Sequence, residues 1–201
     1  MTPTSFDTDR ITHIFFPYVE RKASEVRSKE RRFVYYTTAE TATRILSNKQ
    51  IWLRNTTVMN DYSEVLHGFD CLNASCKAAS GNIFNARLNA CFRGLADEVK
   101  DLFEGWSSSI QRDTYITCVS EHLPGEDQRG RLSMWRAYGG QTGVALVLNS
   151  TAMLINSNAL NVFSSPVAYL NRAAFAVWVK RVAKNMERER GITFRVLVGR
   201  K

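Results

Sequence analysis

Four short segments combine aromatic, hydroxyl, amide and charged side chains in patterns that could bind a ligand or support acid–base chemistry. They are Tyr35–Thr38, Asn60–Glu64, Ser120–Glu121 and Ser133–Gly139. Each has a simpler structural explanation. Asp61 and Glu64 have the spacing of a helix-capping box, and Trp135 and Tyr138 have the spacing of neighbours on one helix face. Four such segments in one short chain favour a shared cleft.

Other candidate chemistries rest on weaker patterns. Glu64 and His67 have the spacing of half a carboxylate-bridged metal site, but no second Glu-x-x-His occurs in the sequence. A helix-start acid and a surface histidine explain the pair, and we expect no bound metal. Cys118 and His122 would form a nucleophile and its base only if the fold brought them together. The sequence contains no dinucleotide-binding, P-loop, nucleophile-elbow or zincin motif.

Composition places the chain among ordinary globular proteins with a basic bias. It has 201 residues, 44% of them hydrophobic, and a formal net charge of +8. That charge could attract nucleic acid or an acidic protein partner. Its signs alternate along Glu20–Arg32 and Lys180–Arg190, however, which is typical of solvated helix faces. The four cysteines are expected to be buried thiols.

The N-terminus and the apolar runs indicate no export or membrane signal. Asp7, Asp9 and Arg10 precede the first short apolar stretch, so the start does not resemble a signal peptide. Runs such as Val144–Leu148 are far shorter than the roughly 20 residues that span a bilayer. We therefore expect a cytoplasmic protein without a membrane segment.

Hydrophobic periodicity and turn residues predict a mixture of strands and helices without strict alternation, which favours the α+β class. We expect a polar helical lead-in over residues 1–32. A single domain over 33–201 should follow, with a small mixed or antiparallel sheet flanked by helices. The predicted strands are 33–36, 50–53, 115–120, 143–148 (fully buried), 162–169 and 192–198. The predicted helices start near Thr38, Asp61, Phe84, Leu132 and Asn171, and the second, third and fifth end at Gly81, Gly105 and Gly191.

Two motifs, in the same order along the chain as in the family, resemble a known bacterial family, the domain of unknown function 2971. The first runs from Tyr36-Thr37-Thr38 through Ile51-Trp52-Leu53 to Met59-Asn60-Asp61-x-x-Glu64. The second joins Val119-Ser120, Leu132-Ser133-Met134-Trp135-Arg136-Ala137-Tyr138-Gly139 and Gly143-Val144-Ala145-Leu146. The resemblance covers about Phe33 to Leu148.

The opening strand and helix of that family are similar to the start of the ADP-ribosyltransferase fold, and its members tend to accompany phage-defence and toxin-like genes. The resemblance implies an NAD-using enzyme in which Tyr36 and Glu64 act in catalysis. The other residues implied to line the substrate site are Thr37, Asn60, Asp61, Ser120, Trp135, Arg136 and Tyr138. Arg136 would hold a phosphate.

This sequence departs from the family pattern at two places. Tyr35 stands where the family often has histidine, and the Trp- and Glu-containing strand with which the family usually ends is not found. The chain would then lack a C-terminal strand and its late glutamate. Glu64 or Glu121 would have to supply the catalytic carboxylate.

Three function classes follow from these patterns. The leading hypothesis is an ADP-ribosyltransferase-like enzyme that uses NAD, or a degenerate relative, in a defence or toxin setting. The alternative is a non-enzymatic module that binds nucleic acid or an acidic protein partner through its basic surface. The third class is a hydrolase or nuclease that uses Asp61 and Glu64 with a divalent ion.

Overall fold

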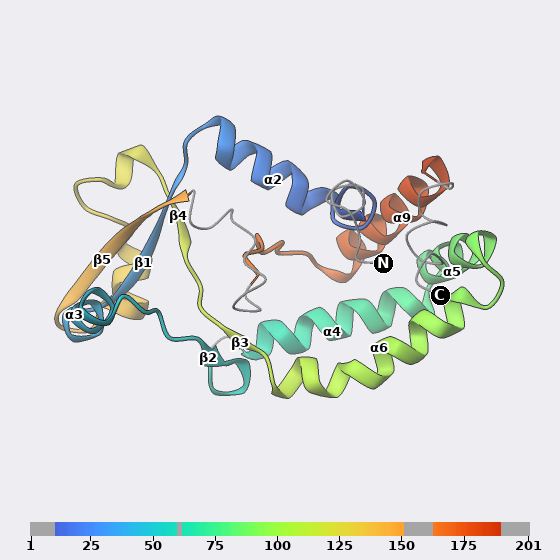
Figure 1. The fold of residues 1–201 in the computed structure, drawn as a ribbon, viewed down its shortest axis with the longest axis horizontal. Helices are drawn as coiled ribbons and strands as arrows, with labels where there is room; N and C mark the ends of the chain where they lie inside the picture. The colour runs from blue at the N-terminus through green and yellow to red at the C-terminus, as the bar shows by residue number, and fades with distance from the viewer. Residues whose placement is uncertain (1–10, 60–61, 151–162, 190–201) are drawn as a thin grey trace. The chain divides into compact units, whose positions relative to one another are not determined.

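The computed structural model describes residues 11–59, 62–150 and 163–189, and the chain divides into two compact units (Figure 1). The helical unit comprises residues 1–20, 55–114 and 166–201, and the sheet unit comprises residues 21–54 and 115–165. Helix α2 (Pro17–Ser28) starts in the first and continues in the second. The helices and the small antiparallel sheet confirm the predicted α+β class.

The sheet unit is built on β1 (Arg32–Thr38), whose aromatic and β-branched residues suit a central strand. It pairs antiparallel with β4 (Ser120–His122) on one side and β5 (Gly143–Asn149) on the other. Helix α3 (Ala39–Asn48) follows β1, and the Thr38 hydroxyl accepts a hydrogen bond from the Thr41 N–H as its N-cap. The predicted strand and helix start are therefore confirmed here.

The helical unit packs helices around a buried apolar cluster. They include α4 (Tyr62–Lys77), α5 (Ala79–Cys91), α6 (Leu95–Arg112) and α9 (Arg172–Arg188). Helix α9 packs on α4 and α5. The Asn171 side chain caps α9 as predicted, accepting from the Ala174 N–H. The core holds Ile14, Leu88, Leu95, Ala96, Val182 and Met186.

The predicted helix ends at Gly81 and Gly105 are wrong. Gly81 lies in the first turn of α5, and Gly105 lies within α6. A Cβ at Gly81 would collide with the Cys76 backbone, so the missing side chain permits the tight corner between α4 and α5. The single helix predicted from Phe84 onward is two helices, α5 and α6. They are separated near Gly94, which has a φ of 86°.

Several predicted strands also differ from the structure. Residues 51–53 and 163–170 form no regular structure, because their β-forming side chains have no neighbouring strand with which to pair. The segment 115–120 supplies only β3 (Tyr115–Ile116), which pairs with β2 (Arg54–Asn55), and the start of β4. Strand β5 is an edge strand with Val147 exposed, not a fully buried one. Asp61, Val162, Gly191 and the strand predicted over 192–198 lie outside the described residues.

Two further expectations can be compared with the structure. All four cysteines are thiols and not disulfides, but only Cys71 is buried, and Cys76 and Cys118 are exposed. The expectation of buried thiols is therefore wrong for those two. Within the described ranges, no helix has the length and apolar character required to cross a bilayer.

Candidate functional site

The signature residues around Trp135 form an unusual turn in the sheet unit. Helix α7 (Leu132–Met134) runs directly into a π-helical turn, η3 (Trp135–Gly139). Turns of this kind are rare and frequently occur at functional sites. The Trp135 ring meets the Tyr36 ring edge-on, with centroids 4.8 Å apart and planes at 89°. The indole N–H donates to the Arg129 carbonyl at 2.8 Å.

Three glycines enclose the Trp135 indole. A Cβ at Gly130 would lie 2.7 Å from Nε1, and Cβ atoms at Gly143 and Gly139 would lie 3.0 and 3.3 Å from Cε3. Gly130 also has a φ of 62°, which disfavours any residue with a side chain. The backbone at these three glycines therefore lies directly against the indole ring. We call Trp135 with Tyr36, Gly130, Gly139 and Gly143 the tryptophan cradle.

The predicted site residues on β1 and β4 support this cradle from inside. Tyr36 is buried, and its hydroxyl accepts a hydrogen bond from the Arg131 N–H at 2.8 Å. Thr37 is also buried. The Ser120 hydroxyl lies 3.9 Å from the Met134 sulfur, next to Trp135 in the chain. In this structure these side chains fix the position of the turn.

The turn presents other predicted residues to solvent. Arg136 and Tyr138 are exposed, and Arg136 makes no ion pair within the described part of the chain. Glu64 belongs to the helical unit, at an exposed position on α4. Asn60 and Asp61 lie outside the described residues. The structure thus brings Tyr36, Trp135 and their neighbours together in the sheet unit.

Beside the cradle lies a charged network that sequence reasoning missed. His122 is buried, and its Nε2 lies 2.8 Å from Asp127 Oδ1. The Arg32 guanidinium reaches the same oxygen at 2.6 Å, from the β1 position opposite His122. His122 Nδ1 lies 3.9 Å from Glu126 Oε2. Among the described residues, His122 Nδ1 is the one buried side-chain nitrogen or oxygen without a hydrogen-bond partner.

Arg131 connects this network to the tryptophan cradle. Its guanidinium donates to Glu126 Oε1 at 2.8 Å and to the Glu121 carbonyl at 3.3 Å, while its backbone N–H bonds Tyr36. The partners are five or more residues apart in an irregular loop, so no helical or strand period marks them in the sequence. The network ties the loop after β4 to the edge of the sheet.

The network lowers the pKa values of two carboxyl groups. Hydrogen bonds from His122 and then Arg32 lower the pKa of Asp127. Burial on its own would raise the pKa of Glu126, but hydrogen bonds from Arg131 and the Leu123 N–H outweigh it and leave that pKa lowered. Both groups stabilise the fold as anions.

Acid is therefore expected to weaken the sheet unit. A carboxyl whose pKa is lowered by folding contributes stability above its unfolded pKa and loses it as pH falls through the folded value. The melting temperature should drop below about pH 4.5. Asp127→Asn should lower it at neutral pH and flatten the acid-side dependence, as measured by circular dichroism at a series of pH values. Asp97→Asn on α6 is the control, and an Asp127→Asn profile parallel to wild type would contradict the expectation.

Around Glu64 and His67 the helical unit shows structural contacts. His67 Nε2 lies 2.9 Å from the Leu170 carbonyl and 3.4 Å from the Cys71 sulfur. A ring nitrogen that donates to a carbonyl cannot also accept the thiol proton. Among the described residues, no group of three or more histidine, cysteine or acidic side chains could hold a metal ion.

Helix α9 carries a second candidate site. Lys180, Arg181, Lys184 and Arg188 are exposed, and at 100° per residue they occupy a face about 100° wide. None of the four forms an ion pair within the described residues. The solvated charged face expected over Lys180–Arg190 is present in its described part, where Glu187 is also exposed and pairs with Arg87 of α5 at 3.0 Å. We call these four residues the α9 basic face.

Comparison with known proteins gives one family match, which covers the Trp135 turn and the α9 basic face. Residues 134–195 match the family described as protein of unknown function (DUF2971). The match supports the family expected from the sequence, and it spans the Trp135 turn, β5 and α9. The motif from Tyr36 to Glu64 lies outside the matched residues, and the description assigns no activity. No curated protein and no solved structure matches the chain.

Proposed function

We propose that the protein binds nucleic acid through the α9 basic face. The observation that carries the proposal is a group of four exposed cations on one face of this helix. Four basic side chains face solvent without a carboxylate partner in the described residues, while Arg172 on the same helix is held by Asp70 at 2.7 and 2.8 Å. The unpaired cations are thus confined to one face.

The stability of the helix does not explain this arrangement. Like charges three or four residues apart on a helix destabilise it by about 0.2–0.5 kcal/mol per pair. Lys184 has such a relation to Lys180, Arg181 and Arg188. An external polyanion would remove the repulsion. A row of phosphates is the natural ligand, because lysine and arginine neutralise phosphates and release bound counterions.

A salt titration tests the proposal. Binding of a short fluorescein-labelled DNA duplex is measured by anisotropy at several salt concentrations. Four neutralised phosphates predict that log K falls against log salt with a slope of about −3.6 for duplex DNA. Affinity should then drop roughly a hundredfold between about 50 and 200 mM salt. No detectable binding at the low-salt end would overturn the proposal.

A second candidate function is nucleotide binding at the Trp135 turn, as an NAD-using enzyme would require. It is favoured by the π-helical turn, which carries Arg136 and Tyr138 at exposed positions within the family-matched segment. Arginine recognises phosphate through several donors held in a fixed plane. Arg136 would bind the pyrophosphate of NAD.

Titration calorimetry with NAD tests this second candidate. Wild-type protein should bind saturably, and Arg136→Gln should weaken binding by about ten- to a hundredfold, the effect of losing one charge-assisted hydrogen bond. Arg129→Gln, at an exposed position of the preceding loop, is the matched control. The second candidate fails if no binding heat is seen or if both variants bind like wild type.

A further inference from the structure

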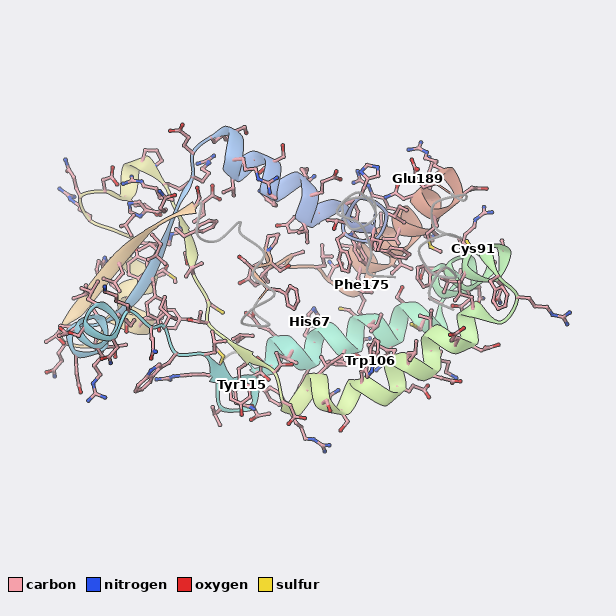
Figure 2. All side chains as sticks on the ribbon, viewed as in Figure 1. His67, Cys91, Trp106, Tyr115, Phe175 and Glu189 are labelled. Carbon is pink, nitrogen blue, oxygen red and sulfur yellow. The ribbon has the colours of Figure 1, made fainter. Side chains whose placement is uncertain are left out.

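Helix α6 carries an exposed apolar stripe. Leu102, Trp106 and Ile110 are spaced four residues apart, and 46%, 60% and 41% of their surfaces are exposed. Figure 2 labels Trp106 on this helix. Glu98, Asp101, Gly105, Leu102 and Trp106 line a shallow hollow on the same helix. A large aromatic ring held open to water in this way is typical of an interaction surface.

Two acidic residues adjoin the apolar stripe of α6. Glu98 and Asp101 line the hollow toward the N-terminus of the helix, and the stripe runs from Leu102 toward the C-terminal end. Attraction to the helix dipole explains acidic residues only within the first turn. Glu104 pairs with Lys100 of the same helix at 3.7 Å. Asp101 lies beyond the first turn, so a cationic surface outside the helix is the simpler reason for Asp101.

The chain itself contains the complementary surface. On α9 the exposed N-terminal half carries Ala173 and Val177, and the α9 basic face occupies the C-terminal half. The two helices have 18 and 17 residues. Set antiparallel, they place acids against bases and the apolar stripe against Ala173 and Val177. Antiparallel packing also opposes the helix dipoles favourably.

We propose that the protein self-associates by docking α6 of one chain against α9 of a second copy. The contact joins two different faces of the chain, so it is head-to-tail, and the rotation between successive copies decides whether it closes into a ring or stays open. Trp106 would anchor the apolar half, and Asp101 would meet Lys184 in the charged half. The inference does not depend on the proposed function. Because it uses the α9 basic face, nucleic acid and self-association would compete.

Charge reversal and complementation test the contact by sedimentation velocity at low and high salt. Wild type should sediment as more than a monomer at low salt and dissociate as salt rises. Asp101→Lys and Lys184→Glu, both at exposed positions, should each weaken association at least about tenfold. An equimolar mixture of the two variants should associate again, since each reversed charge then meets its opposite.

The outcomes separate this inference from the proposed function. A wild type that stays monomeric at every concentration would overturn the docking, as would a mixture that fails to recover association. Trp106→Ser should also weaken association, with little change in its salt dependence. Asp101→Lys should keep nucleic-acid binding, whereas Lys184→Glu should reduce it. Loss of association without loss of nucleic-acid binding in Asp101→Lys therefore identifies the α6 face.

Discussion

Replacing Lys180, Arg181, Lys184 and Arg188 together by glutamine is expected to abolish nucleic-acid binding while leaving the fold intact. Each lysine or arginine that neutralises a phosphate contributes about 0.9 to the slope of log K against log salt for duplex DNA. Losing four such contacts corresponds to roughly a thousandfold weaker binding at about 0.1 M salt. The same change should flatten the salt dependence nearly completely. Fluorescence anisotropy over a salt series measures both effects.

The stability of this variant distinguishes a binding surface from a structural one. Removing three like-charge neighbours at Lys184 should stabilise the helix slightly, and glutamine is a good helix former. Arg188 favours the helix C-terminus, so its loss offsets part of that gain. We expect the free energy of unfolding to stay within about 1 kcal/mol of wild type.

A matched control separates the position of the charges from their number. Lys29, Arg44, Arg54 and Lys77 are exposed and do not belong to α9, so replacing them by glutamine removes the same net charge without changing that helix. This control should bind with a salt slope close to that of wild type. Equal losses in both variants would mean that net charge, and not the α9 basic face, attracts the nucleic acid.

The sequence predicted the elements that rest on local rules. The aromatic and β-branched residues of β1, the Thr38 and Asn171 caps and the Gly-led start of β5 all occur where expected. Glycine led to wrong helix ends at positions where it serves packing between elements and does not end a helix. Gly81 admits the backbone of Cys76, and Gly105 leaves the hollow beside Trp106. A rule that treats glycine as a helix end cannot predict either feature from the sequence.

The candidate sites also have parts that the sequence predicts and parts that it does not. Motif order brought Tyr36 and Trp135 into one hypothesis, and the structure places their rings in contact. The His122 network could not be predicted, because it depends on the register that sets Arg32 opposite His122 and on a loop without a period. The α9 basic face could not be predicted without knowing which side of the helix is buried. The pairing of Glu187 with Arg87 depends on the packing of α5 against α9.

Trp135→Ala is expected to destabilise the sheet unit by about 3 kcal/mol, at the lower end of the range for truncating a large aromatic side chain. The ring packs on Tyr36, and the indole donates to Arg129. Gly130, Gly139 and Gly143 have no side chains that could move into the space left behind. The loss should appear in urea unfolding followed by circular dichroism.

Trp135→Phe separates the contribution of ring packing on Tyr36 from that of the indole hydrogen bond to Arg129. Phenylalanine keeps an aromatic edge against Tyr36 but removes the hydrogen bond to the Arg129 carbonyl, so a loss of about 1 kcal/mol is expected. If alanine cost no more than phenylalanine, the glycines would not be closing on the ring to stabilise the turn. A large alanine effect with a small phenylalanine effect would instead show that packing holds the turn rigid. That rigidity is what Arg136 requires if it is to meet a phosphate from a fixed position.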